Sequence, residues 1–192
     1  MTELLNPGIP SPQTRASGTP EGFFYLPDFL SQEQHDGLLL LLQGLTFKRD
    51  IVRGKPMRRA YAQFGYAYVT AGKKVAEAPP WPEFLAVLAA KGLPFCPQGT
   101  TFNQCIVTRY PAGAGIDWHP DARVFGDCIM AVSLASAARL QFRPNHAAEP
   151  SYEVLAVPGS LYIMQGVARW EYQHRVVPVK AERFSITFRV VK

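Results

Sequence analysis

Cysteines are few in this chain, and long hydrophobic runs and runs of like charge are missing from it. The three cysteines among its 192 residues have neither the spacing of a metal site nor that of a redox motif, so we expect reduced thiols in a cytoplasmic protein. The longest apolar run, 38–42, is far too short to cross a bilayer, and the N-terminus lacks the pattern of a secretory signal. We therefore expect neither a disulfide-stapled secreted domain nor a membrane protein.

The charge balance favours negatively charged partners without locating a binding surface. There are 20 basic and 15 acidic residues, which give a net charge of +5, and the sequence pI is about 9.2. The basic residues are scattered, so no single patch stands out. With 47% apolar residues, the chain is long enough for one domain with a substantial core.

Residues 1–20 differ in composition from the remainder of the chain. They are rich in Pro, Ser, Thr and Gly and show no apolar periodicity, which predicts a flexible tail. The remaining residues, 21–192, contain neither an internal repeat nor a linker. We therefore expect them to form a single domain.

The first half of that domain predicts one strand and two helices. Residues 23–26 have the character of a strand, and the capping-box pattern that starts at Ser31 predicts a helix over about 32–44. A second helix is expected from Trp81 to a C-cap glycine at Gly92. Both helices are expected to pack against a sheet.

From residue 102 onward the pattern changes to short β-type runs that are separated by Gly and Pro turns. Many short strands of this kind, preceded by two helices, are typical of a jelly roll, a mainly β member of the α+β class. The expected strands are 103–110, 115–119, 127–134, 138–143, 152–156, 160–164 and 183–191.

Two histidines and an aspartate form the strongest candidate for a metal site. In an extended segment residues i and i+2 lie on one face, and the intervening proline favours that conformation, so His119 and Asp121 can reach the same ion. His174 would complete a facial triad of two imidazoles and one carboxylate, which leaves open positions and suits non-haem Fe(II). The other histidines, His35 and His146, are expected to be solvated and to have no metal role.

Residues 183–189 alternate between polar and large apolar side chains, as in a strand with one face in a core. Arg183 and Arg189 lie on the polar face, where half-buried guanidinium groups are costly without an anionic partner. A dicarboxylate co-substrate would supply that partner, because the planar arginine fork pairs with a carboxylate through two hydrogen bonds. The alternative is an edge strand with two solvated arginines.

These motifs resemble those of the AlkB family of Fe(II)- and 2-oxoglutarate-dependent dioxygenases. The resemblance covers about half of the chain strongly and is carried by 102–104, 108–113, 133–134, 140–142 and 174–179. It implies the family's fold, a double-stranded β-helix or distorted jelly roll with helices that buttress one sheet. It also implies Fe(II), 2-oxoglutarate and O2 as the metal, co-substrate and oxidant. The iron ligands would be His119, Asp121 and His174.

The same resemblance assigns roles around the co-substrate. Arg189 would bind a carboxylate of 2-oxoglutarate, and Tyr110 would donate its hydroxyl to the same molecule. Arg183 would lie over the metal side of the site. Thr108 and Ser185 stand near the co-substrate, where many family members have asparagine, and their shorter hydroxyls can hydrogen-bond there directly or through water.

A weaker resemblance over 57–68 points to the substrate side, since this segment is similar to the family's substrate lid. Tyr66 would stack on the target base, while Arg58 and Arg59 would hold phosphates. The alternative is a strand with core aromatics and solvated arginines. Arg123 replaces an acidic residue that reads the base in many repair members, which leaves the identity of the base open.

The resemblance thus implies an oxidoreductase that oxidatively demethylates alkylated bases, in single-stranded DNA or RNA or in a base flipped from a duplex, as in DNA repair or RNA demethylation. We expect it to act as a monomer. The same chemistry could serve a tRNA modification or a protein side chain. Two other classes are compatible with the residues: a zinc hydrolase and a non-catalytic nucleic-acid-binding domain.

Overall fold

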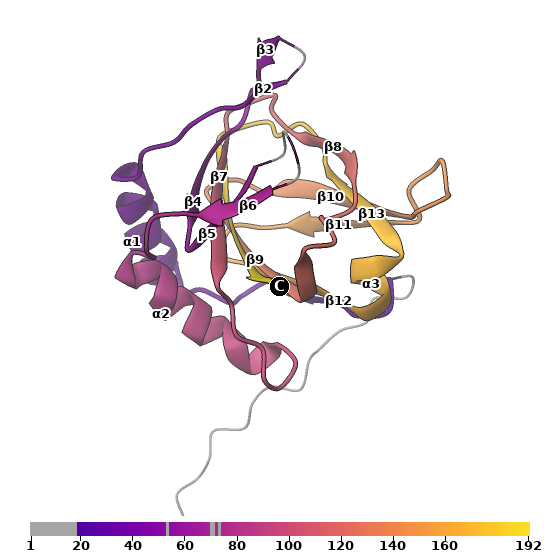
Figure 1. Ribbon diagram of the computed structural model, residues 1–192, viewed down its shortest axis with the longest axis horizontal. Coiled ribbons are helices and arrows are strands. Elements are labelled where there is room, and N and C mark those ends of the chain that lie inside the picture. Colours follow the sequence, from indigo (N-terminus) through magenta and orange to yellow (C-terminus); the bar gives the residue numbers. More distant parts are fainter. Residues whose placement is uncertain (1–18, 53, 70–71, 73) are drawn as a thin grey trace, which may run out of the picture.

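Two β-sheets packed face to face form the body of the protein, and two helices cover the outer face of the larger sheet (Figure 1). The computed structural model describes residues 19–52, 54–69, 72 and 74–192, so nearly all of the predicted tail, 1–20, lies outside the described residues. This arrangement confirms the predicted mainly β jelly roll. Within the described part of the chain, no helix is long and apolar enough to span a membrane.

The larger sheet has six antiparallel strands in the order β1-β12-β9-β14-β7-β4, so its two longest strands lie side by side at its centre. Sequence neighbours are rarely sheet neighbours here, as in a jelly roll. The strands are β1 (Phe23–Leu26), β12 (Leu161–Gln165), β9 (Phe125–Leu134), β14 (Arg183–Val191), β7 (Gln104–Tyr110) and β4 (Ala60–Phe64).

The smaller sheet has four strands in the order β11-β10-β13-β8. All seven strands predicted after residue 102 are present, but β13 was missed. The reason is its pattern: the inward position between Tyr172 and Val176 is held by a histidine, so the apolar alternation expected of a strand is broken. The strands are β11 (Tyr152–Ala156), β10 (Ala138–Pro144), β13 (Tyr172–Val176) and β8 (Ile116–His119).

Two short hairpins stand outside these sheets: β2 (Ile51–Val52) with β3 (Lys55–Pro56), and β5 (Tyr66–Val69) with β6 (Lys74–Glu77). Gly65 turns the chain from β4 into β5 at a positive φ of 73°. A Cβ at this position would lie 2.1 Å from the carbonyl oxygen of Asn103, so only glycine fits. After this turn, β5 pairs with β6 in a separate two-stranded sheet.

Both predicted helices are present as α1 (Gln32–Gln43) and α2 (Glu83–Gly92). The capping box is confirmed: Ser31 Oγ accepts from the backbone of Gln34, and Gln34 Oε1 accepts from the backbone of Ser31, each at 3.2 Å. The predicted C-cap at Gly92 is wrong, because this glycine is helical and a 3-10 turn, Leu93–Phe95, follows it. Glycine is needed here for packing against the sheet, since a Cβ would lie 2.3 Å from the sulfur of Met130.

The larger sheet separates two apolar clusters. On its outer face, alternate residues of β9 and β14 pack against α1 and α2, and the aromatic rings of Trp81 and Phe102 lie on Phe188. On its inner face, a second cluster fills part of the space between the two sheets and includes Phe23, which packs on Phe142. Polar side chains, among them Thr108, Ser185 and Arg189, line a cavity in the rest of that inner space.

The expectation of a solvated His35 is wrong. Its side chain is buried, with the residue 8% exposed, and Nε2 accepts a hydrogen bond of 3.1 Å from the backbone of Ala135. Ala135 has a positive φ of 70°, and His35 satisfies the amide of this unusual turn. The histidine therefore ties α1 to the end of β9.

A short helix, α3 (Gly166–Trp170), joins β12 to β13.

Candidate active site

The inner face of β14 carries the polar residues that the alternation predicted, while its other face lies in the helix-side cluster. Antiparallel pairing with β7 places Arg183 opposite Tyr110 and Ser185 opposite Thr108. Four of the predicted co-substrate residues therefore lie on adjacent strands and face the space between the sheets.

The two candidate histidine ligands come from neighbouring strands of the smaller sheet. His174 of β13 is paired in register with His119 at the end of β8, and their ring centroids are 4.4 Å apart. Nδ1 of His119 lies 2.8 Å from the carbonyl oxygen of Asp117. Nδ1 therefore donates to that oxygen, which fixes the tautomer and leaves the lone pair of Nε2 available to a metal.

Asp121 lies beside both the histidines and an arginine. Its Oδ2 is 3.6 Å from Nε2 of His174, and its Oδ1 accepts from Nη2 of Arg189 at 2.8 Å. Burial alone would raise the pKa of this carboxyl, but the charges of Arg189 and the two histidines outweigh it and lower the pKa to about 2. Asp121 is therefore ionised at neutral pH.

The histidines are held neutral. Burial is the main cause that lowers the pKa of His174 to about 3, and the neighbouring ring of His119 lowers it further. Burial also lowers the pKa of His119. Neutral imidazoles and an ionised carboxylate are the protonation states that a divalent metal requires of its ligands.

The donor set fits Fe(II), although the side chains do not stand in the geometry of a closed metal cluster. Across the residues that the structure describes, no group of three His, Cys, Asp or Glu side chains has that geometry. For Asp121 the cause is visible, because one of its oxygens is turned to Arg189. Two imidazoles and one carboxylate on one side of a site match non-haem Fe(II) with open positions.

The structure places Arg183 away from the candidate metal ligands, so its role over the metal side remains a prediction that the geometry does not favour. Its side chain is fully buried, with 0% exposure, at the other end of the inner face. Nε and Nη2 donate to Ser133 Oγ at 3.1 and 2.7 Å, and the guanidinium lies 5.1 Å from the ring centroid of Tyr110. Six residues of strand, roughly 20 Å, separate it from Arg189, the arginine that pairs with Asp121.

Both arginines have buried N–H groups that fit an anion. Nη1 of Arg183 and Nε of Arg189 have no hydrogen-bond partner within the described part of the protein. Such donors are costly to leave unpaired. The hydroxyls of Thr108 and Ser185 line the same cavity as Arg189, and Arg183 lies beside the ring of Tyr110, which also lines it. Each arginine therefore offers a buried donor to an anion.

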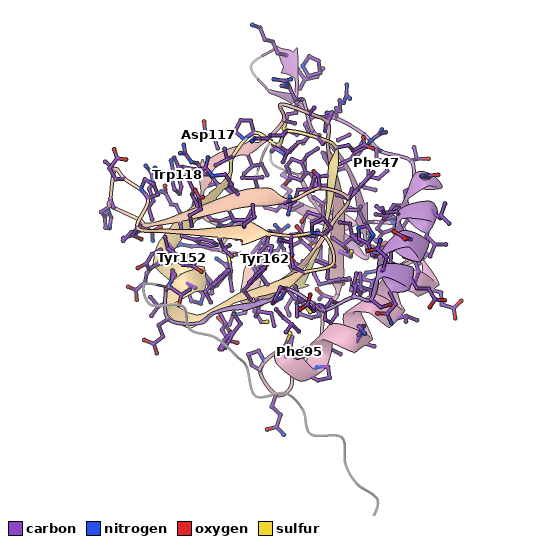
Figure 2. The ribbon with its side chains drawn as sticks, turned by 180° about the vertical axis from the view of Figure 1, so that it is seen from behind. Phe47, Phe95, Asp117, Trp118, Tyr152 and Tyr162 are labelled. Carbon is purple, nitrogen blue, oxygen red and sulfur yellow. The ribbon has the colours of Figure 1, made fainter. Side chains whose placement is uncertain are left out.

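A cavity of about 620 Å³ brings Thr108, Ser185 and Arg189 together with further aromatic and charged side chains, while Arg183 is not among its lining residues. The iron-ligand candidates, Thr108, Tyr110, Ser185 and Arg189 all contribute to its walls. Figure 2 shows Tyr162 toward the centre of the molecule and Trp118 at the side away from the helices. A second group of lining residues, called the rim below, consists of Asp50, Met57, Arg59, Tyr61, Gln63, Tyr68 and Trp118.

The predicted substrate residues are only partly at this rim. Arg59 lines the cavity, but Arg58 is exposed and donates to the carbonyl of Ala112 at 3.2 Å. Tyr66 (37% exposed) and the exposed Arg123 are not among the described residues that line the cavity. The geometry therefore does not bring these three to the site.

Tyr68 is the aromatic of the β5–β6 hairpin that reaches the cavity. Its ring meets that of Phe125 edge-on at 5.4 Å, and the guanidinium of Arg189 lies 4.4 Å from the centroid of the same phenylalanine. Gln63 fixes the strand, because its Oε1 accepts from the backbone of Tyr68 at 2.7 Å. Tyr66 and Tyr68 have the same parity along the strand, so alternation could not distinguish them.

Asp50 was also missed. It accepts a hydrogen bond of 2.5 Å from the hydroxyl of Tyr61, and both line the rim. Burial and this carboxylate raise the pKa of Tyr61. The signal that could have located the pair is the inward parity of Tyr61 and Gln63 on β4, shared with Arg59 just before that strand.

Residues 22–189 match the 2OG-Fe(II) oxygenase superfamily, and the chain therefore belongs to this superfamily of Fe(II)- and 2-oxoglutarate-dependent dioxygenases. Within it, the chain is similar to AlkB homologues at low identity. It is 28% identical over 189 residues to alpha-ketoglutarate-dependent dioxygenase alkB homolog 3 of Rattus norvegicus, covering 86% of this chain and 62% of the relative.

Other relatives carry different names. The chain is 26% identical over 192 residues to tRNA (carboxymethyluridine(34)-5-O)-methyltransferase alkbh8 of Xenopus tropicalis, covering 96% of this chain and 28% of the relative. It is 27% identical over 154 residues to the mitochondrial alkB homolog 7 of Mus musculus, covering 79% of this chain and 65% of the relative. The chain thus spans less than two thirds of the length of these relatives.

Solved structures confirm the fold. The structure of OsALKBH1 superimposes with a TM-score of 0.69 at 17% identity, covering 90% of this chain and 97% of that one. A Pseudomonas putida prolyl-4-hydroxylase superimposes with a TM-score of 0.60 at 18% identity, covering 89% of this chain and 93% of that one. The shared architecture does not select a substrate.

Proposed function

We propose that this dioxygenase oxidatively demethylates alkylated bases in single-stranded DNA or RNA. The observation that carries the proposal is that His119, Asp121 and His174 line the same cavity as the aromatic and basic side chains of the rim. A flipped or unpaired base needs flat side chains to stack on and cations for its phosphates. The net charge of +5 agrees with a polyanionic partner.

Bound Fe(II), with 2-oxoglutarate and O2, would supply oxidation of a substrate C–H bond coupled to decarboxylation of the co-substrate to succinate and CO2. On a methyl group attached to a base nitrogen, hydroxylation gives an N-hydroxymethyl group. Its carbon leaves as formaldehyde, and the nitrogen regains a proton. The base is restored without cutting the strand.

The chain's own residues hold the reactants in place. His119, His174 and Asp121 are assigned as ligands, with the first histidine oriented by the carbonyl of Asp117. Arg183 is assigned to the far carboxylate of 2-oxoglutarate, because its Nη1 is buried and unpaired among the described residues while Ser133 holds its other nitrogens.

Arg189 is assigned to the metal side of the co-substrate. Its Nη2 donates to the Asp121 carboxylate. Its Nε is buried without a partner in the described structure, so it is free to donate to an oxygen of 2-oxoglutarate. Phe125 covers its guanidinium, with the ring centroid 4.4 Å away. This removes solvent from the arginine and strengthens both contacts.

Among the lining residues, Tyr68 offers a ring for the base, and Arg59 offers a cation for a phosphate. The ring of Trp118 is already covered by the guanidinium groups of Arg143 and Arg175, at 4.4 and 4.7 Å from its centroid. Asp50 offers an acceptor in reach of the same space, in place of the acidic residue for which the chain has Arg123. An acceptor favours a base edge that presents N–H groups. Arg58, Tyr66 and Arg123 remain predictions for contacts outside the cavity.

The test is succinate production from 2-oxoglutarate by the Fe(II)-loaded protein, with and without methylated single-stranded DNA and RNA oligonucleotides, followed by mass spectrometry of the bases. Stimulated turnover with base demethylation is expected. Tyr68→Ala should abolish the stimulation and leave slow uncoupled turnover, whereas the matched variant Tyr66→Ala on the same hairpin should retain it. Equal losses in both variants would assign the hairpin a structural role only.

Other outcomes select the alternatives. Basal turnover that no oligonucleotide stimulates would direct the search to protein side chains. Stimulation by tRNA alone would favour a tRNA modification, which the similarity to alkbh8 over 96% of this chain also supports. Turnover with Zn²⁺ and without 2-oxoglutarate would indicate a hydrolase, and binding of nucleic acid without any turnover a non-catalytic domain. The monomeric state and the cytoplasmic location are further proposals, which gel filtration and fractionation test.

A further inference from the structure

One buried arginine outside the predicted site holds the segment that carries Asp121. Arg169, 3% exposed on α3, directs its guanidinium at four backbone carbonyls. Nε donates to Gly126 at 3.2 Å, Nη1 to Asp121 at 3.4 Å, and Nη2 to Ala122 at 2.9 Å and Phe125 at 3.1 Å. The loop between β8 and β9 is thus wrapped around a single side chain.

This loop has little regular structure of its own. Its own backbone contributes a turn in which Phe125 donates to the carbonyl of Ala122 at 3.1 Å. The hydrogen bonds from Arg169 are charge-assisted and buried, and such bonds are about twice as strong as neutral ones. The planar fork of arginine reaches several acceptors in one plane, which the single ammonium of lysine cannot do.

The position of Arg169 links the two halves of the candidate metal site. α3 leads directly into β13, which carries His174, and the helix is anchored where Ala168 donates to the carbonyl of Glu21 at 2.8 Å. Trp170 covers the guanidinium, with its ring centroid 4.1 Å away. One side chain therefore fastens the segment of Asp121 to the segment of His174.

We infer that Arg169 is a positioning residue that places Asp121 against the two histidines and thereby sets the affinity of the metal site. The inference rests on the proposed role of His119, Asp121 and His174 as ligands. It extends that role to a residue that touches neither metal nor substrate. Loss of such outer support costs about 10–100-fold in metal affinity.

The test uses Co(II), whose visible absorption reports the ligand geometry, in titrations of the full chain. Arg169→Lys should bind Co(II) about 10–100-fold more weakly than the wild type and show an altered spectrum. The matched control Arg139→Lys replaces an arginine that pairs with Glu153 on the outside of the smaller sheet, and it should leave both unchanged. Equal affinity and an identical spectrum for Arg169→Lys would overturn the inference.

A second measurement separates positioning from general stability. In an Asp121→Asn background, Arg169→Lys should have little further effect on Co(II) affinity, because its action passes through Asp121. Additive losses would overturn the inference and assign Arg169 a purely structural role. If Arg169→Lys does not fold, Trp170→Leu, which keeps the charge and removes the covering ring, should still weaken Co(II) binding several-fold. Unchanged binding in that variant would also refute the inference.

Failure of the proposed function gives a different result. If the wild type binds Co(II) no better than His174→Ala, the metal site itself is absent and the inference fails with it. If the wild type binds Co(II) through His174 and Arg169→Lys binds equally well, only the role of Arg169 is refuted.

Discussion

The two faces of β14 have opposite characters although they share one backbone. Phe184, Ile186 and Phe188 face the helices and lie in an apolar cluster. Arg183 and Arg189 face the smaller sheet, with buried N–H groups that have no partner in the described part of the protein. The same contrast continues on β7, where Thr108 faces inward and Val107 lies in the apolar cluster under the helices.

This contrast separates stability from function within a single layer. Burial of large apolar side chains on the helix side stabilises the fold, at about 25 cal/mol per Å². Buried charges on the inner side cost free energy until a metal and an anion complete them. The apolar cluster under the helices therefore offsets the cost of unpaired buried N–H groups on the inner face. Variants on the helix side should lose stability, whereas variants on the inner face should lose metal or co-substrate binding.

The largest effect is expected on the inner side, at His174. His174→Ala should abolish iron-dependent succinate production, because two ligands and water hold Fe(II) poorly. Circular dichroism should show a folded protein, since the removed ring belongs to the site and not to the apolar clusters. Substantial turnover in this variant would remove the triad assignment.

On the helix side, Phe188→Ala should lower the free energy of unfolding by about 3–5 kcal/mol, because it leaves a cavity beneath Trp81 and Phe102. Urea titration measures this, and turnover per folded molecule should be unchanged. The matched control is Ser185→Ala, three residues away on the inner face of the same strand, which should cost little stability and raise the KM for 2-oxoglutarate. A stable Phe188→Ala variant that has lost its turnover would contradict the separation of the two faces.

Local signals explain which parts of the fold were predictable. The capping box at Ser31 and the alternation of 183–189 involve neighbouring residues, so their consequences can be derived without knowing the fold. β13 was missed because a candidate metal ligand, His174, stands at an inward position. The pattern of a strand is thus weakest where the strand carries the site.

The candidate iron ligands could be predicted as a group, but the substrate side and the orientation of the arginines could not. His119, Asp121 and His174 were expected together, and pairing of β8 with β13 brings them together. Which arginine lies beside Asp121 could not be predicted, because Arg183 and Arg189 share one parity and differ only in how the strand is placed against the loop after β8. Tyr66 and Tyr68 present the same ambiguity on β5.

That orientation can be tested by comparing the two arginines. Arg183→Lys should raise the KM for 2-oxoglutarate by about 10–100-fold, since an ammonium cannot replace a fork that is held by Ser133. Its Co(II) affinity without co-substrate should change little. Arg189→Lys should weaken Co(II) binding as well, because it disturbs the Asp121 carboxylate. The reverse pattern would restore the assignment expected from the sequence.

A smaller effect, on stability alone, follows from the inner-face histidine that is held neutral. The pKa of His174 falls from 6.5 to about 3 on folding, so between these values the unfolded chain binds a proton that the folded protein does not. Stability is therefore present above pH 6.5 and is lost as the pH falls, by about 2 kcal/mol at pH 5. Asp121 adds to this loss only below its unfolded pKa of 3.8.

Urea unfolding of the chelator-treated protein at pH 7 and pH 5 measures this loss. His174→Asn should reduce the difference, because the group with the larger pKa shift is gone and only His119, whose pKa burial also lowers, still contributes. His146→Asn, at an exposed position, should leave the difference intact. An equal pH dependence in the wild type and in His174→Asn would mean that His174 does not titrate differently in the folded and unfolded chain. Burial of the histidine would then cost less free energy than its low pKa implies. The difference between the two faces of the sheet would be due to the buried arginines alone.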